Sequence, residues 1–229
     1  MSTRTLQLPG QALTYQLKRS ARRSIGLKIS RDGLTVTLPL RLPIVEAERA
    51  VRQKLDWILD KLAAQAERPA PPAALACGSQ LLWLGEPITL RTGSTRSRLQ
   101  GVELHLACAD HPEQITAKLV HFYQRSARAH FSERVRHWGE TMGLTPRRLA
   151  LSSARGRWGS CSSSGGLRLN WRLMQSPPDV IDYVVIHELA HLAELNHSPR
   201  FWAIVETHCP DWKTRRDWLK RNSVLLMDW

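Results

Sequence analysis

Two histidines and a glutamate near the end of the chain have the spacing of a metal-dependent hydrolytic site. His187, Glu188 and His191 form the pattern His-Glu-x-x-His, and His197 follows after five further residues. On a helix, residues four apart lie on one face about one turn apart, so His187 and His191 can bind one metal ion. Glu188 would hold a metal-bound water without being a ligand. With His197 as third ligand, one tetrahedral position stays open, as a catalytic zinc site requires.

The third ligand has a rival in the sequence. Glu206, on the next expected helix, would give a set of two histidines and one glutamate. We favour His197, because a helix start beside it would hold it near the second histidine. The spacing equals that of the metzincins, but Glu194 stands at their glycine position and Met227 is the only later methionine. The pattern is therefore not a metzincin in detail.

The motif also has a purely structural interpretation. It lies in an apolar stretch from Val180 to Leu192, which is typical of a buried helix. Two histidines in such a helix need polar partners, and they could bond to the backbone or to each other. The six other histidines have no ligand-like spacing, and we interpret them as structural: His105, His111, His121, His130, His137 and His208.

Start signals define the helices that would position these side chains. Prolines at 177–178 open the motif helix, and Asp179 and Asp182 favour its first turn. Asn196 tolerates a left-handed turn, which would fold the third histidine back onto the metal. Ser198, followed by a proline, is a good N-cap for the next helix.

The rest of the chain alternates strand and helix patterns. Segments that read as short strands occur at 13–17, 25–29, 34–38, 81–84, 88–91, 102–106, 149–153 and 167–171. Apolar residues at steps of three and four predict helices at 44–62 and 111–142. The segments 31–33 and 85–87 supply hairpin turns, and the proline-rich segment 69–74 predicts a linker.

The charge of the chain is unusual. It has 33 basic and 20 acidic side chains, a formal net charge of +13. The segment 141–178 has no acid but contains Arg147, Arg148, Arg155, Arg157, Arg168 and Arg172. Such a balance attracts polyanions, so nucleic acid or a nucleotide is a candidate partner through this basic surface. A solvated basic face is the alternative interpretation.

Other sequence features predict a cytoplasmic protein. No apolar run approaches the ~18–20 residues that a membrane span needs, so we expect no membrane partner. The first ten residues lack the charged, apolar and small-residue sections of a signal peptide. Four scattered cysteines, Cys77, Cys108, Cys161 and Cys209, form no Cys-x-x-Cys pair and favour a reduced compartment.

The motif and its surroundings resemble a known family, the YgjP-like (WLM/SprT-related) zinc metallopeptidases. The matching blocks lie at 22–29, 33–39, 157–161, 169–170, 183–192, 196–198 and 201–202. The resemblance implies an α+β fold in which a zincin-like metallopeptidase domain follows a small β-rich amino-terminal part. We accordingly expect an amino-terminal β unit with an amphipathic helix at 1–68, a linker and β-hairpin region at 69–110, and the catalytic domain at 111–229.

The resemblance also implies roles for single residues. His187, His191 and His197 would be zinc ligands, and Glu188 would be the catalytic base. Arg157 and Asn170, just before the motif helix, are candidates for substrate binding. Asn170 could instead only hold a strand end, and Arg157 could be simple surface charge.

Three functions remain open from the sequence. The favoured one is a zinc-dependent metallopeptidase that cleaves peptide bonds of a protein or peptide substrate with a Glu-activated, zinc-bound water. A second is a metal-dependent hydrolase of a phosphoanhydride or nucleotide, whose phosphates the arginines would bind. A third is a nucleic-acid-associated binding protein with a structural metal site. Glu188 argues against the third, because a structural site does not need it.

Overall fold

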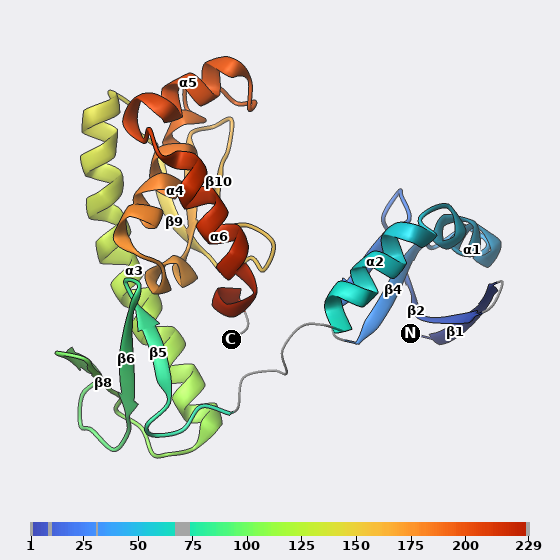
Figure 1. Ribbon diagram of the computed structural model, residues 1–229, viewed down its shortest axis with the longest axis horizontal. Helices are drawn as coiled ribbons and strands as arrows, with labels where there is room; N and C mark the ends of the chain where they lie inside the picture. The colour runs from blue at the N-terminus through green and yellow to red at the C-terminus, as the bar shows by residue number, and fades with distance from the viewer. Residues whose placement is uncertain (1, 9–10, 31, 67–73, 228–229) are drawn as a thin grey trace. The chain divides into compact units, whose positions relative to one another are not determined.

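The computed structural model describes residues 2–8, 11–30, 32–66 and 74–227. The fold is α+β, as the sequence predicted, and the chain divides into two compact units, Met1–Pro71 and Pro72–Trp229 (Figure 1). Each unit has its own cluster of buried apolar side chains. The linker predicted at 69–74 lies almost wholly outside the described residues, as does Arg31 of the first predicted turn. The finer boundary at residue 110 stays a prediction.

A four-stranded sheet forms the first part of the amino-terminal unit. Strands β1 (Ser2–Leu8), β2 (Gln11–Ser20), β3 (Gly26–Ser30) and β4 (Gly33–Pro39) pair in the order β1-β2-β4-β3. The outer pairs are antiparallel and the central β2–β4 pair is parallel. Helices α1 (Ile44–Gln53) and α2 (Leu55–Ala66) follow the sheet.

Two features of this unit differ from the sequence prediction. Strand β1 was not predicted, because Leu6 is the one buried side chain in Ser2–Leu8 and the segment has no clear apolar alternation. The helix predicted at 44–62 is broken at Lys54, whose φ of −115° and ψ of 21° end α1 before α2 begins. The apolar stripe continues across the break, with Val51 and Ile58 both buried, which explains why the pattern resembled one helix.

The second unit opens with a sheet of the same topology. Strands β5 (Gln80–Trp83), β6 (Glu86–Arg91), β7 (Arg98–Gln100) and β8 (Glu103–His105) pair in the order β5-β6-β8-β7, again with a parallel central pair. The first hairpin turns at Leu84 and Gly85, whose φ values of 50° and 86° are typical of a two-residue type I′ turn. Strand β6 therefore begins at Glu86, inside the predicted turn. Strand β7 was not predicted.

The site-bearing elements follow a long helix, α3 (Pro112–Met142), which ends at Gly143 in the left-handed conformation. A three-stranded sheet of β9 (Arg148–Ser152), β10 (Gly159–Cys161) and β11 (Gly166–Asn170) has the order β10-β11-β9. Strand β10 therefore lies at an edge of this sheet, between the predicted strands at 149–153 and 167–171, where no strand was predicted. The strand predicted at 167–171 ends at Asn170, because a 3-10 helix, η1 (Trp171–Gln175), starts there.

The central helix of this unit is α4 (Pro178–Ala190), which packs against α3, α6, β10 and β11 (Figure 1). Helices α5 (Pro199–His208) and α6 (Trp212–Met227) complete the chain. Most side chains of α4 are buried, so the helix is apolar on nearly every face. Within the described ranges, none of the helices combines the length and apolar character that a membrane crossing requires.

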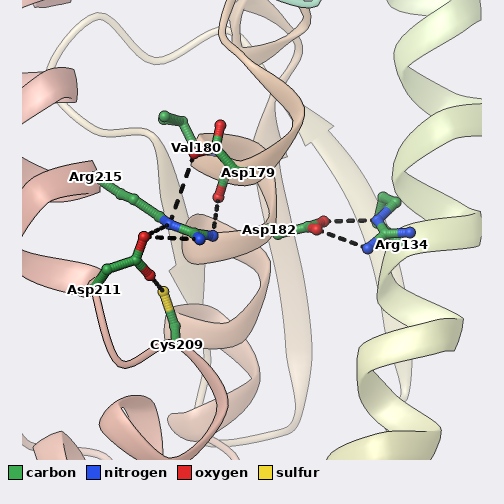
Figure 2. Close-up of polar contacts among 7 residues, drawn as sticks. All are labelled: Arg134, Asp179, Val180, Asp182, Cys209, Asp211 and Arg215. Atoms are coloured by element: carbon green, nitrogen blue, oxygen red, sulfur yellow. Dashed lines mark hydrogen bonds and ion pairs between the residues drawn. The ribbon is translucent and has the colours of Figure 1, made fainter.

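Ion pairs fix α4 on two sides (Figure 2). Arg134 of α3 donates to both carboxylate oxygens of Asp182, over 2.6 and 2.7 Å. On the other side Arg215 of α6 donates to the backbone oxygen of Asp179 over 2.9 Å and pairs with Asp211. Asp182 was predicted to favour the amino-terminal turn, and the structure gives it this second partner on α3. These contacts hold α4 in one position against its neighbours.

Candidate metal centre

The last turn of α4 and the loop after it bring three histidines together. His187 lies in that turn, and His191 is the residue at which the helix ends, with φ of −67° and ψ of −13°. His197 returns to the helix through the loop that leads into α5. Ser198 caps α5 by accepting a hydrogen bond from the backbone nitrogen of Phe201 over 3.3 Å, as its sequence position predicted.

The loop before α5 differs from the prediction in one respect. Asn196 does not adopt the left-handed conformation, since Leu84 is the one non-glycine residue with positive φ in the described part of the chain. The side-chain oxygen of Asn196 instead accepts a hydrogen bond from the backbone nitrogen of Ser198, over 2.9 Å. This local turn directs the chain into α5 and keeps His197 near α4.

The ring nitrogens of the three histidines converge. One nitrogen from each of His187, His191 and His197 lies within 4.8 Å of the others, and the Nε2 atoms of His187 and His197 are 3.1 Å apart. The Nδ1 atom of His191 lies 3.1 Å from the backbone oxygen of Glu194, which leaves its Nε2 free to face the cluster. Glu206 is exposed on α5 and is not part of this cluster.

Aromatic side chains of α5 pack against the histidine cluster. The ring of Phe201, which is fully buried, lies 4.5 to 4.9 Å from the ring centres of all three histidines. Trp202 stacks on His197 with centroids 5.7 Å apart and stacks on Trp212 of α6 with centroids 4.0 Å apart. The family resemblance included both aromatic residues of α5, but their role as a support was not predicted.

Burial sets the protonation state of His187 and His191. Burial, followed by the two neighbouring histidines, lowers the pKa of His187 to about 3, and burial also lowers the pKa of His191. Both imidazoles are therefore neutral at pH 7, which is the form that binds a metal. The Nδ1 atom of His187 is buried and has no hydrogen-bond partner among the described residues.

Glu188 lies against strand β10. Its side chain is 6% exposed, and burial raises its pKa to about 7, an effect that the positive charge of Arg157 opposes. A Cβ atom built on Gly159 would lie 2.4 Å from Oε1 of Glu188, so only glycine leaves room for this carboxylate. A carboxyl group with a pKa near 7 can both accept and donate a proton at neutral pH. No local pattern in the sequence predicts this contact between Gly159 and Glu188.

The two candidates for substrate binding lie in different surroundings. Asn170 is fully buried, and its side-chain nitrogen donates to the backbone oxygens of Ala154 and Arg157 over 2.7 and 3.1 Å. Its side-chain oxygen accepts from the backbone nitrogen of Arg172, so it caps η1. These contacts favour the structural interpretation of Asn170. Arg157 is exposed and lines a cleft that also contains Glu188.

Clefts open on both sides of the histidine cluster. One, of about 500 Å³, is lined by the segment from Arg157 to Gly159, by His187 and Glu188 of α4, and by one face of α6. The other, also of about 500 Å³, is lined by His191, the loop after it and the serine-rich loop that follows β10. Through these two clefts, solvent can reach the cluster from the side of Glu188 and from the side of His191.

The fold and this arrangement define an α+β protein whose central helix carries a three-histidine cluster beside a buried glutamate. A family model described as YgjP-like, metallopeptidase domain matches residues 23–222. The chain therefore belongs to the YgjP-like metallopeptidase domain family, as the resemblance in its sequence indicated.

Comparison with solved structures found two metallopeptidase zymogens. Abylysin of Pyrococcus abyssi is 23% identical, with a TM-score of 0.37, over 40% of this chain and 92% of that one. Jannalysin of Methanocaldococcus jannaschii is 16% identical, with a TM-score of 0.34, over 38% of this chain and 93% of that one. A comparison with curated protein sequences gave no match.

Proposed function

We propose that this protein is a zinc-dependent metallopeptidase in which His187, His191 and His197 bind the metal and Glu188 is the catalytic base. The observation that carries the proposal is the convergence of three imidazole nitrogens within 4.8 Å beside a buried glutamate. Membership of a metallopeptidase family supports the same conclusion.

The donor set fits zinc. Two nitrogens bound at ~2.0–2.1 Å to one tetrahedral zinc ion are about 3.3 Å apart. The separation of 3.1 Å between His187 and His197 is close to this value. The hydrogen bond from His191 to the carbonyl of Glu194 would orient that ring, as is common for metal-binding histidines. Zinc at this position would supply Lewis-acid chemistry, which makes a water nucleophilic at neutral pH and polarises a carbonyl.

Glu188 would carry out the proton transfers of the reaction. Glu188 takes the proton from the attacking water onto its carboxylate and passes it to the leaving amine. Gly159 keeps this carboxylate in place, because the backbone of β10 packs directly against it. Arg157, whose charge already acts on Glu188, contacts the substrate from the same cleft.

The edge position of β10 suits an extended peptide. In the three-stranded sheet β10 pairs with β11 alone, and the same strand packs against α4. A substrate strand can add to such an edge through main-chain hydrogen bonds, which hold it without regard to sequence. We propose that the peptide backbone lies along Gly159–Cys161, which would place a scissile bond next to Glu188.

The test uses zinc-loaded protein, casein-like peptides and nucleoside triphosphates. We expect peptide cleavage that falls by ~10²–10⁴ in Glu188→Gln, while the zinc content stays the same. Glu206→Gln, an exposed glutamate on α5, is the matched control and should keep both activity and zinc. If only nucleotides are cleaved and Glu188→Gln abolishes that, the protein is a phosphoanhydride hydrolase. If Glu188→Gln retains full activity, the proposed mechanism is wrong.

A further inference from the structure

One face of α6 forms a wall of the cleft that contains Glu188. Arg216, Leu219, Lys220 and Ser223 all line this cleft. They stand at positions i, i+3, i+4 and i+7, so helical periodicity puts them on the same side of α6. Helix α6 packs on α4, which carries His187 and Glu188 on the neighbouring wall. The sequence blocks that carry the family resemblance end at 201–202, so they contain none of these four residues.

The cleft is strongly cationic. Three exposed basic side chains line it, Arg157 from the loop before β10 and Arg216 and Lys220 from α6. The acid among the lining residues is Glu188, which is buried behind them. In the described part of the chain, Lys220 has neither an ion pair nor a side-chain hydrogen bond. The charge of Lys220 is therefore not neutralised by an ion pair with another described residue.

The aromatic stack described above holds Arg216 in place. Its guanidinium carbon lies 4.9 Å from the centre of the Trp212 ring, which is 7% exposed. Its contacts with Asp217 are long, at 3.4 Å, and both side chains are exposed, so this ion pair competes weakly with a ligand. A cation that rests on a fixed ring loses little freedom on binding an anion.

Three further lining residues are apolar and can contact the carbon atoms of a substrate side chain. Trp158, Val184 and Leu219 add apolar side chains to the lining of the cleft. An acidic amino acid has both parts, a short apolar stem and a carboxylate at its end. Arginine binds carboxylates through two parallel hydrogen bonds, which gives the contact a direction as well as a charge.

Resting on the proposed peptidase function, we propose that this cleft binds an acidic side chain of the substrate beside the scissile bond. Arg216 and Lys220 determine the preference, and the protein is selective for peptides with aspartate or glutamate at that place. The two α6 residues are better probes than Arg157, whose charge also acts on Glu188.

The test compares peptides that differ by one residue. Zinc-loaded protein is given peptides with glutamate or glutamine at each position that flanks the cleaved bond, and kcat/KM is measured for each. The wild type should prefer glutamate at one position by about tenfold, since that side chain would form exposed ion pairs with both Arg216 and Lys220. Raising the salt to about 1 M should reduce this ratio.

Substitutions then assign the preference to α6. In Arg216→Gln/Lys220→Gln the ratio should fall to about two- to threefold. In Arg216→Glu/Lys220→Glu it should reverse, so that glutamine is preferred to glutamate at the same position. The control Lys213→Gln/Arg221→Gln removes two charges from the same helix outside the cleft lining, and it should keep the wild-type ratio.

The outcomes separate this inference from the proposed function. If no peptide is cleaved, or only a nucleoside triphosphate is hydrolysed, both the peptidase function and the acidic preference fail. If peptides are cleaved with equal kcat/KM, or if the α6 variants keep the wild-type ratio, the peptidase stands and the acidic preference is overturned. Loss of the ratio in the control pair as well would also overturn it, because overall charge would then be the cause.

Discussion

Replacing Gly159 with alanine should disable Glu188 while leaving the histidine cluster intact. The new Cβ atom would lie 2.4 Å from Oε1, 2.5 Å from Cγ and 2.6 Å from Cδ of Glu188. Ordinary contact begins at 3.4 Å, so the carboxylate must move by about 1 Å. It cannot move freely, because the side chain is 6% exposed.

The size of the effect follows from this displacement. A reacting group that is misplaced by ~1 Å can cost ~10²-fold in rate. The expected fall in kcat/KM is therefore about 100-fold, which corresponds to ~2.7 kcal/mol of transition-state stabilisation. The added methyl group should also destabilise the fold by ~1–3 kcal/mol, as overpacking commonly does. Zinc affinity should stay near the wild-type value, because the nearest atoms that the methyl group meets all belong to Glu188.

The assay measures peptide cleavage, zinc content and thermal unfolding of the same protein sample. Gly156→Ala is the matched control, since a Cβ atom at that position meets nothing within 4 Å. We expect the control to keep kcat/KM within about threefold, against ~100-fold for Gly159→Ala. Full activity in Gly159→Ala would refute the idea that the position of Glu188 depends on this glycine. Loss of zinc in that variant would refute the separation of base and metal site.

Three further predictions concern the metal, the helix clamp and pH. His197→Ala should lower zinc affinity at least ~100-fold by competition with a chelator, whereas Glu206→Ala should not change it. Asp182→Asn should lower the free energy of unfolding by ~1–3 kcal/mol in urea, because its half-buried arginine partner on α3 loses its counter-charge, while the exposed control Glu140→Gln should cost less than ~0.5 kcal/mol. Burial, followed by a nearby arginine, holds the pKa of His130 below its ordinary value, so the unfolded chain takes up the proton more readily. Stability should therefore be lost as pH falls through about 6.5, and His130→Leu should reduce that loss.

Each of these three predictions would be refuted by a specific result. Unchanged zinc affinity in His197→Ala, with a loss in Glu206→Ala, would make the glutamate the third ligand. Equal unfolding energies for Asp182→Asn and Glu140→Gln would mean that the clamp on α4 contributes nothing beyond a surface pair. If His130→Leu and the wild type lose stability in parallel between pH 8 and 5, other groups cause the acid sensitivity.

Local signals in the sequence predicted the elements that carry the histidines. Prolines, a serine cap and apolar spacing marked the starts of α4 and α5, and the structure has both helices at these places. Strand β10 has three residues, Gly-Ser-Cys, with no apolar alternation, so its pairing with β11 comes from packing and could not be found locally. The break at Lys54 was equally hidden, since the apolar stripe runs on through it.

The contacts of the candidate site also fall into those that local sequence predicts and those that it does not. The histidines lie within eleven residues of chain, where helical geometry and one turn decide their positions. Gly159 meets Glu188 across twenty-nine positions, and Arg216 and Lys220 reach the cleft from a helix that follows the motif. Contacts between residues so far apart in the sequence depend on how β10 and α6 pack on α4. No local pattern in the chain encodes them.

The stack of Trp202 between His197 and Trp212 gives the centre an optical signal of its own. The indole rings of Trp202 and Trp212 are stacked with centroids 4.0 Å apart, and Trp202 also lies against the ring of His197. Imidazole clusters also accept copper, whose unpaired electron quenches nearby tryptophan emission. Tryptophan fluorescence can therefore report occupancy of the site directly, without a substrate.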